Sequence, residues 1–236
     1  MIIYGAVIMK GIAYGVGVGP GDPELMTLKA VRLIRENDVI AVPGTAAKES
    51  IAYKIAVRNV PELAEKTLLP VNMPMTRDKA VLEIEHKNGA ALIEEYLDKG
   101  LNVVYLTLGD PTVYCSFTYL QRILESDGYN VELVSGITSF CAAAARLNVP
   151  LAESDEEIHI LPGIPEKSGF SGNSGTYVIM KSGRKMNAVK EALKNEASEI
   201  FAAENCTTDN EKLYRGSDEI PDSTGYFSLV IAKIRG

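Results

Sequence analysis

The sequence predicts an α/β protein of two domains, with a mostly parallel sheet in the first domain and a mixed sheet in the second. Up to about residue 150, apolar β-branched runs alternate with helical segments, which is the rhythm of βαβ units. Beyond that point strands predominate, with one clear helix. Hydrophobic residues make up 46% of the 236 residues, enough for one large core or two modest ones.

The elements follow in order along the chain. In the first domain we expect strands at about 12–18, 38–42, 102–107 and 130–134, and helices at 24–36, 47–59, 77–98, 116–126 and 138–147. In the second we expect strands near 157–162, 176–181, 198–203 and 226–234, a helix at 185–195, and a Gly/Ser-rich connector at 168–175. The resulting boundaries are an N-terminal extension at 1–10, a first α/β domain at 11–148 and a second at 149–236. The extension is too short for a signal peptide, and its first eight residues are expected to carry no chemistry.

The stretch 103–116, Val-Val-Tyr-Leu-Thr-Leu-Gly-Asp-Pro-Thr-Val-Tyr-Cys-Ser, is the most informative about a site. A buried-looking strand runs directly into Gly109-Asp110-Pro111, and a helix is expected to start soon afterwards. Open α/β sheets bind ligands beyond the carboxyl ends of their strands, so this turn predicts an exposed backbone and one fixed carboxylate that suits a cationic small molecule. Alternatively, Asp110 only caps the helix at 116–126.

A second loop of this kind, at residues 15–24, has the sequence Gly-Val-Gly-Val-Gly-Pro-Gly-Asp-Pro-Glu. Reading G-x-G-x-x-G from Gly15 places Pro20 at the sixth position, and reading it from Gly17 places Asp22 there. It is therefore not a dinucleotide fingerprint, and the sequence contains no Walker-type phosphate loop. The glycines permit close approach of the backbone, and the prolines stiffen it.

A third loop follows the strand at 130–134, and Thr138 or Ser139 begins the next helix. Four consecutive alanines, 142–145, lie in the first turns of that helix. Either they are good helix formers packed tightly against a sheet, or they leave room for a flat ligand beside the two hydroxyl groups.

The three loops, in this order and spacing, resemble those of the tetrapyrrole methylase family, the S-adenosylmethionine-dependent enzymes of cobalamin and siroheme synthesis. The matching pieces are GVGPGDPELMTLKAVRLIRENDVIAVP, YLTLGDPTVYCSFTYL, VSGITSFCAAAARLNVPL and YVIMK at 177–181. Within the family, the forms DVIAVP, GDPTVYCSF and SFCAAAA are most similar to those of the enzymes that methylate C20 of precorrin-2 or of its cobalt complex, cobalt-factor II. The resemblance implies the two-domain fold of the family, a C-methyltransferase activity and a homodimer. It leaves open which of the two tetrapyrroles is the substrate.

The resemblance also implies how the cofactor binds. S-adenosylmethionine is expected in a cleft between the two domains, with S-adenosylhomocysteine as its product. The family contacts carry over to Pro20, Leu108, Gly109, Asp110, Val113, Thr138, Ser139, Met180 and Cys206. The last position is a glycine in the related uroporphyrinogen enzymes. Those enzymes also have an aspartate, proposed as a proton acceptor, where this chain has Pro43, so the resemblance identifies no general base.

The net charge of −7 argues against nucleic acid as a partner. A precorrin carries a ring of carboxylates, so an acidic enzyme has to concentrate positive charge near its site. Lys181, Arg184 and Lys185 cluster just after a strand and are the best candidates for contact with the substrate. Asp22 and Tyr114 are two further candidates, with loop structure and packing as the alternative roles.

Other features of the composition predict a cytoplasmic protein without a metal site. No apolar run approaches the roughly 18 residues of a membrane helix. Three widely spaced cysteines are not a disulfide framework and fit a reducing compartment. The chain has only two histidines: His86 is expected to be solvated on a charged helix, and His159 to be structural within a strand.

Three other functions have to be weighed. Diphthine synthase resembles this family in fold and cofactor but methylates a protein histidine derivative. A non-catalytic cofactor-binding module is a second alternative, although a pure scaffold has no need of the Gly-Asp-Pro turn. A nicotinamide oxidoreductase is disfavoured, because the third glycine of the fingerprint and an acidic residue for the ribose are both missing.

Overall fold

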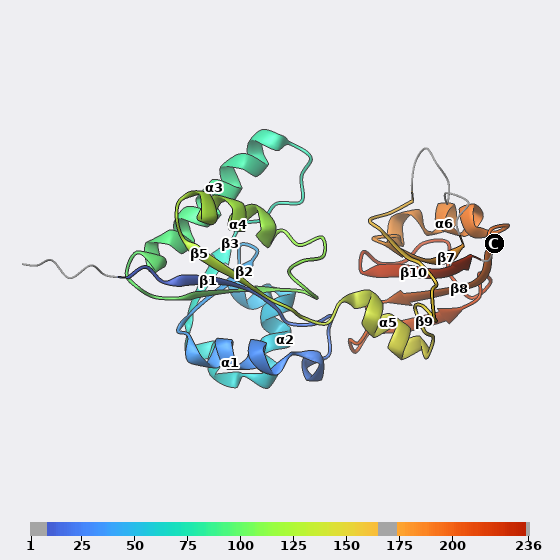
Figure 1. Cartoon of the computed structure of the whole chain (residues 1–236), viewed down its shortest axis with the longest axis horizontal. Helices are drawn as coiled ribbons and strands as arrows, with labels where there is room; N and C mark the ends of the chain where they lie inside the picture. Colours follow the sequence, from blue (N-terminus) through green and yellow to red (C-terminus); the bar gives the residue numbers. More distant parts are fainter. Residues whose placement is uncertain (1–8, 165–173, 235–236) are drawn as a thin grey trace, which may run out of the picture. The chain divides into compact units, whose positions relative to one another are not determined.

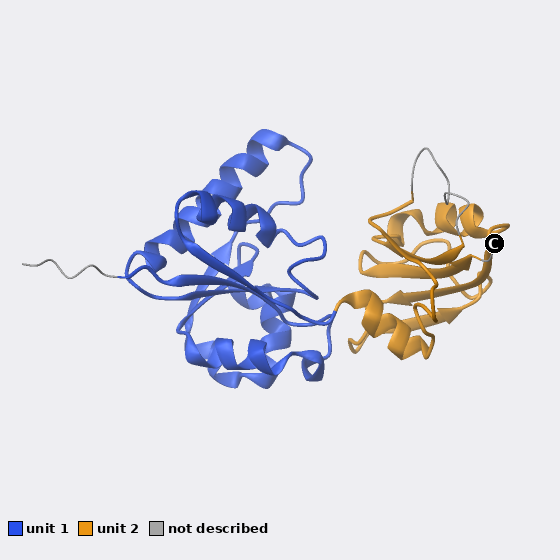
Figure 2. Cartoon of the chain, viewed as in Figure 1, with its two compact units in different colours: residues 1–137 blue, residues 138–236 orange. Residues whose placement is uncertain are grey.

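A computed structural model describes residues 9–164 and 174–234. Most of the expected extension at 1–10 and of the connector at 168–175 lies outside the described residues. The chain divides into two compact units, residues 1–137 and 138–236 (Figure 2). The division falls before the expected boundary at 148, because helix α5 (Ser139–Leu147) packs against two strands of the second unit.

Unit 1 contains a five-stranded parallel sheet in the order β3-β2-β4-β1-β5. Its strands are β1 (Ile12–Gly17), β2 (Val39–Pro43), β3 (Thr67–Val71), β4 (Val103–Thr107) and β5 (Asn130–Val134). The chain leaves β1 towards β2 and β3, then returns to β4 and continues to β5 on the far side of β1. The strand order therefore reverses between the neighbouring strands β1 and β4, which is where doubly wound sheets bind ligands.

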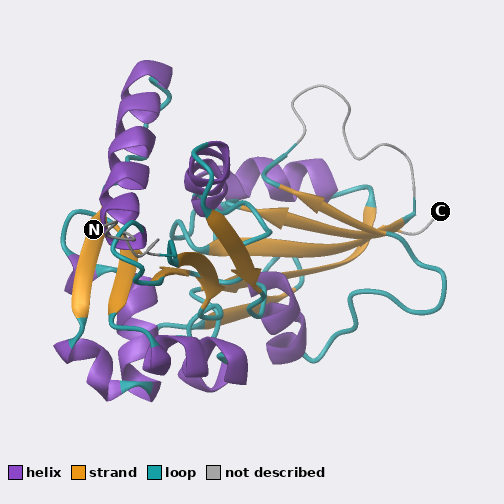
Figure 3. Ribbon diagram, turned by 60° about the vertical axis from the view of Figure 1, so that its left-hand side comes forward, coloured by secondary structure: helices purple, strands orange, loops and turns teal. Residues whose placement is uncertain are grey.

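Helices cover both faces of this sheet (Figures 1 and 3). They are α1 (Leu28–Glu36) and α2 (Ile51–Asn59) on one face, and α3 (Lys79–Leu97) and α4 (Phe117–Ser126) on the other. Successive residues of β4 alternate between the two cores, since Val104 packs with α1 and α2 while Tyr105 packs with α3 and α4. All of β4 is buried, as expected for a central parallel strand.

Three elements of unit 1 differ from the sequence prediction. The expected helix at 47–59 is a 3₁₀ turn, Ala47–Glu49, followed by α2 from Ile51. The expected helix at 24–36 is a 3₁₀ turn, Pro23–Leu25, followed by α1 from Leu28, because Asp22 caps the turn and Thr27 caps α1 separately. Strand β3 was not predicted. It contains Pro70, which a strand tolerates at the sheet edge, and β3 is an edge strand.

Unit 2 contains a mixed five-stranded sheet in the order β6-β7-β10-β8-β9. Its strands are β6 (Ile158–Leu161), β7 (Gly175–Met180), β8 (Ala197–Glu204), β9 (Lys212–Arg215) and β10 (Ser228–Ile234). Among the described strands of this sheet, β6 and β7 pair in parallel and the other neighbours are antiparallel. The predicted mixed sheet is confirmed, but the short polar edge strand β9 was missed.

Helix α6 (Met186–Leu193) packs on the unit 2 sheet with Met186, Val189 and Leu193, which join side chains of β7, β8 and β10 in one core. Helix α5 contacts β8 and β10. In the two described ranges, no helix combines the length and the apolar character needed to cross a membrane.

Candidate functional site

The loops after β1 and β4 pair with each other at the reversal point of the unit 1 sheet. The N–H of Gly109 donates to the carbonyl of Gly19 (2.8 Å), and the N–H of Gly19 donates to the carbonyl of Gly109 (3.3 Å). Both glycines have positive φ, +78° at Gly19 and +70° at Gly109, a region that glycine enters without steric cost. The glycines therefore let two strand-end loops meet backbone to backbone.

The loop after β5 packs against this pair of loops. A β-carbon added to Gly136 would lie 2.1 Å from the Gly109 carbonyl oxygen and 2.9 Å from the Cα of Gly17. No other residue type fits that space. All three loops singled out in the sequence thus meet through glycine backbones within unit 1.

Asp110 holds the junction together with both carboxylate oxygens. Its Oδ2 accepts from the N–H of Gly136 (2.9 Å), and its Oδ1 accepts from the N–H (2.7 Å) and hydroxyl of Thr112. The residue is only 7% exposed. It does not cap α4, since the residue before that helix is Ser116. The alternative of a simple helix cap was therefore wrong, and the carboxylate orders the backbone of two loops.

The other cofactor and substrate residues expected in unit 1 are near Gly19 or Asp110 in the sequence. Pro20 is buried directly after Gly19, whereas Leu108 and Val113 are half-buried. The Oδ1 of Asp22 accepts from the N–H of Glu24 (2.9 Å), which gives this carboxylate a capping role.

Tyr114 is an exposed residue in an uncommon backbone conformation. Its φ is +48° and it is 47% exposed. A bulky residue with positive φ stores strain, which collects at ligand-contacting segments. This geometry supports the hypothesis that Tyr114 contacts a ligand.

Thr107 and Cys115 form a contact behind the central loop that the sequence analysis did not predict. The Thr107 hydroxyl and the Cys115 sulfur lie 3.1 Å apart, and the N–H of Phe117 donates to the same sulfur (3.3 Å). Burial raises the pKa of the Cys115 thiol. The thiol therefore fixes the end of the loop where α4 begins.

Thr138 and Ser139 are at the start of α5, at the beginning of unit 2. Thr138 is the N-cap residue, yet its side chain makes no capping hydrogen bond. Its Oγ1 is buried and has no hydrogen-bond partner among the residues that the structure describes. Because buried hydroxyls normally have a partner, this one is suited to receive a hydrogen bond from, or donate one to, a ligand.

Met180 and Cys206 lie at the same end of the unit 2 sheet, where β7 and β8 finish and β10 starts. Met180 ends β7 and pairs with Leu229, which in turn pairs with Ala203 near the end of β8. Cys206 follows β8 by two residues. The structure thus places the two expected cofactor residues of unit 2 at one end of its sheet.

The three expected substrate cations follow β7 at this end of the sheet. Lys181 has φ +57°, and Arg184 and Lys185 belong to the short 3₁₀ turn that precedes α6. All three are exposed. The structure therefore presents these cations at the surface of unit 2, in one short loop.

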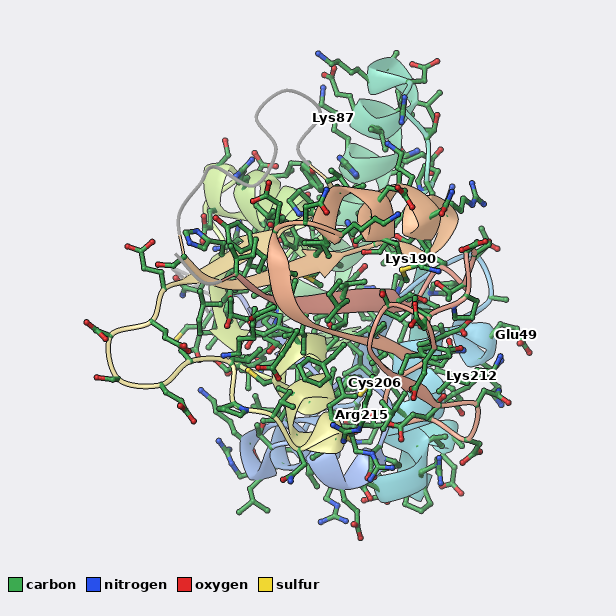
Figure 4. All side chains as sticks on the ribbon, turned by 90° about the vertical axis from the view of Figure 1, so that its right-hand side faces the viewer. Glu49, Lys87, Lys190, Cys206, Lys212 and Arg215 are labelled. Atoms are coloured by element: carbon green, nitrogen blue, oxygen red, sulfur yellow. The ribbon has the colours of Figure 1, made fainter. Side chains whose placement is uncertain are left out.

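Cys206 lies in the turn between β8 and β9 (Figure 4). Beside it is an ion pair between Glu211 of the same turn and Arg146 of α5. Arg146 binds both oxygens of Glu211, at 2.9 and 3.1 Å from its Nε, and Glu211 also accepts from the N–H of Thr207 (2.7 Å). Hydrogen bonding to Arg146 lowers the pKa of Glu211. Burial, with the charge of Glu211 adding to it, raises the pKa of Cys206 to about 12. A pKa raised to this extent keeps the thiol protonated at neutral pH.

The two histidines lie outside these loops. His86 is half-buried and stacks on Tyr119, with 4.6 Å between ring centroids, so its side chain is only partly solvated. Burial lowers its pKa. His159 stacks on Tyr177 at 4.4 Å between centroids. No group of three or more His, Cys, Asp or Glu residues in the described part of the chain is arranged to hold a metal ion.

The geometry defines a doubly wound α/β unit whose glycine loops meet at the strand ends, joined to a second unit with a mixed sheet. The chain belongs to the tetrapyrrole (corrin/porphyrin) methylase family, whose model matches residues 13–219. The family expected from the three loops is therefore confirmed.

Individual relatives agree with this assignment. The chain is 37% identical over 225 residues to a protein of Methanocaldococcus jannaschii named a probable cobalt-precorrin-2 C(20)-methyltransferase, covering 93% of this chain and 95% of the relative. It is 28% identical over 232 residues to a precorrin-2 C(20)-methyltransferase of a Sinorhizobium species, covering 94% of each. A uroporphyrin-III C-methyltransferase of Thermus thermophilus, solved with S-adenosylhomocysteine, has the same fold, with a TM-score of 0.70, 22% identity and coverage of 94% and 97%.

Proposed function

We propose that this protein is an S-adenosylmethionine-dependent methyltransferase that methylates C20 of precorrin-2 or of its cobalt complex in cobalamin biosynthesis. The observation that carries the proposal is the likeness, over nearly the whole length of both chains, to a relative that bears this name. This chain matches relatives named for the metal-free substrate and for the cobalt-containing one, so the experiment below includes both tetrapyrroles.

The residues of this chain fit a cofactor with a methionyl and a nucleoside part. The Gly19–Gly109 pairing leaves a backbone without side chains at the strand ends, where a ligand can approach closely. The unpartnered Oγ1 of Thr138 offers one polar contact. The residues that we propose for the cofactor are Pro20, Leu108, Gly109, Asp110, Val113, Thr138, Ser139, Met180 and Cys206.

The chemistry asks the protein mainly for orientation. S-adenosylmethionine supplies an activated methyl group on a sulfonium, so the chain has to hold the two reactants in line. The Asp110–Gly136 hydrogen bond keeps the loops after β4 and β5 in one arrangement before any ligand binds. Cys206 is given a backbone contact, because its protonated, buried thiol offers no charge.

Positively charged side chains on unit 2 attract the carboxylates of the substrate. Lys181, Arg184 and Lys185 are exposed in one short loop, and each can approach a carboxylate of the tetrapyrrole rim. Asp22 and Tyr114 are proposed as further substrate contacts from unit 1. For Tyr114 the support is its positive φ, and Asp22 adjoins the first glycine loop.

The cofactor class is tested by thermal stability. S-adenosylhomocysteine at a hundredfold excess over its dissociation constant should stabilise the protein by about 2.7 kcal/mol through mass action, and NADH should not. Stabilisation by NADH alone would instead support an oxidoreductase.

The reaction is tested by anaerobic incubation with S-adenosylmethionine and each of the two tetrapyrroles, followed by mass spectrometry and NMR of the product. One added methyl at C20 is expected. Methylation at another ring carbon would leave the family intact and overturn the C20 assignment. If the chain binds the cofactor but neither binds nor methylates a tetrapyrrole, the result would instead support a diphthine synthase-like protein methyltransferase or a non-catalytic cofactor-binding module.

The expected homodimer and cytoplasmic location are proposals of the same kind. The homodimer follows from the family resemblance and is checked by sedimentation equilibrium. The cytoplasmic location is supported by Cys115, Cys141 and Cys206, which are all free thiols, as expected in a reducing compartment.

A further inference from the structure

Two neighbouring aromatic residues, Tyr226 and Phe227, are exposed just before β10. Tyr226 is 45% exposed and Phe227 is 43% exposed, whereas β10 is buried from Ser228 onwards apart from Lys233. Their rings meet edge to face, with 5.1 Å between centroids and 83° between planes. Large apolar side chains grouped on a surface mark an interaction site more often than isolated ones do.

The backbone that carries this aromatic pair is fixed from one side by the end of β8. The N–H of Asn205 donates to the carbonyl of Phe227 (2.9 Å), and the N–H of Gly225 donates to the Oε1 of Glu204 (2.6 Å). Glu204 is itself buried. The buried carboxylate of Glu204 therefore holds this segment in place through a hydrogen bond to its backbone.

The other side of the segment docks against the loop that carries the cations. The N–H of Thr224 donates to the carbonyl of Gly183 (3.1 Å), and the N–H of Ser182 donates to the carbonyl of Ser228 (3.3 Å). A β-carbon added to Gly183 would lie 1.9 Å from the Gly225 carbonyl oxygen. The aromatic pair thus lies between the loop of Lys181, Arg184 and Lys185 and the turn that contains Cys206.

We infer that Tyr226 and Phe227 form the aromatic surface on which the macrocycle of the tetrapyrrole substrate rests. The inference rests on the proposed function and names residues that the family resemblance did not supply. A flat, largely apolar ring with a rim of carboxylates matches an aromatic pair bordered by three cations. The face of the ring would pack on the two aromatic side chains, and the carboxylates would be attracted to the cations. An apolar protein partner would not explain the three cations, and a simple anion would not explain the two exposed aromatic rings.

The test compares the Tyr226→Ala, Phe227→Ala double variant with the wild-type chain. The probe is the oxidised, metal-free form of precorrin-2, and its absorbance and fluorescence report binding. The variant should bind it about tenfold more weakly or worse, since the apolar contact of two aromatic side chains is lost. S-adenosylhomocysteine affinity, measured by calorimetry, should stay within about twofold.

Two controls make the result specific. Tyr119→Ala removes an equally exposed tyrosine, 49% exposed, from α4 and should leave tetrapyrrole affinity unchanged. The loss in the aromatic variant should persist at high salt, because apolar contact is not screened as charge attraction is. If the double variant does not fold, the two single alanine variants decide by the same comparison.

The outcomes separate this inference from the proposed function. If the wild-type chain binds no tetrapyrrole, the proposed function fails and the aromatic surface fails with it. If the wild-type chain binds the tetrapyrrole and the aromatic variants bind it equally well, the inference is overturned and the proposed function stands.

Discussion

The Oδ2 of Asp110 accepts a hydrogen bond of 2.9 Å from the backbone N–H of Gly136, and this bond joins the loop after β4 to the loop after β5. Asp110 is buried, so the bond forms away from water, where a lost partner costs most. A side chain that the sequence marks as a ligand contact thus also organises the protein's own backbone.

Asp110→Asn should weaken both stability and cofactor binding. An amide can accept only at its oxygen, so its NH₂ group would face one of the N–H donors of Thr112 or Gly136. We expect a loss of about 1.5–3 kcal/mol in the free energy of unfolding and at least about a tenfold loss of S-adenosylhomocysteine affinity. Calorimetric titration and denaturant unfolding measure the two effects. Unchanged affinity in a destabilised variant would limit Asp110 to a structural role.

Gly136→Ala should destabilise unit 1 severely. The added methyl group would overlap the Gly109 carbonyl, and backbone has to move to admit it. The expected cost is about 3 kcal/mol or more. Gly128→Ala is the control: its φ is +80° and no atom of the described residues lies within 4 Å of the added carbon, so only conformational strain of about 1–2 kcal/mol is expected. Equal urea midpoints for the two variants would argue against a tight junction.

Glu211→Gln should cost stability in a pH-dependent way. Because Arg146 lowers the pKa of Glu211 in the folded state, the ion pair stabilises the fold above the ordinary carboxyl pKa, and this contribution is lost as pH falls through the lowered value. Wild type should exceed the variant by about 1–2 kcal/mol at pH 7, and the difference should shrink below about pH 4.

The control for this pH series is Glu83→Gln, which removes an exposed pair with Lys87 on α3. Exposed pairs contribute little, so thermal melts of this variant and wild type should coincide at all pH values. A Glu211→Gln deficit that grows towards acid pH would contradict the assigned role of Arg146.

The three thiols should react at different rates with an aromatic disulfide reagent at pH 8. Cys141 is exposed and should react first. Cys206 is buried with a pKa of about 12, and burial also raises the pKa of Cys115, so both should react only after denaturant is added. Peptide mapping of the labelled protein identifies the site, and early labelling of Cys206 would show that the turn after β8 opens readily.

Replacing Arg184 and Lys185 with alanine should weaken tetrapyrrole binding and leave S-adenosylhomocysteine binding nearly intact. The attraction between exposed cations and carboxylates is screened within about 10 Å at 0.1 M salt, so the deficit should diminish as salt is raised. Titrations at several salt concentrations measure it. A deficit that is independent of salt would assign these residues a packing role instead.

The sequence by itself determined the family, the central strands of both sheets and the three glycine loops. These features are local: a buried parallel strand is a continuous apolar run, and a strand-end turn contains glycine and other turn-forming residues in adjacent positions. β4 and the Gly109-Asp110-Pro111 turn were therefore predicted within a residue or two. The short edge strands β3 and β9 were missed because edge strands need neither continuous apolarity nor every backbone donor.

Only the tertiary structure decided what the side chains in those loops do. It turned Asp110 from a free carboxylate into the partner of Gly136, stacked His86 on Tyr119 and buried Glu204 against the segment that presents Tyr226 and Phe227. Each of these contacts joins residues that are separated in the chain, so no local pattern specifies it. The physical reason is that a carboxylate or an aromatic ring suits water, a ligand or a buried partner almost equally well, and the folded backbone determines which of the three it meets.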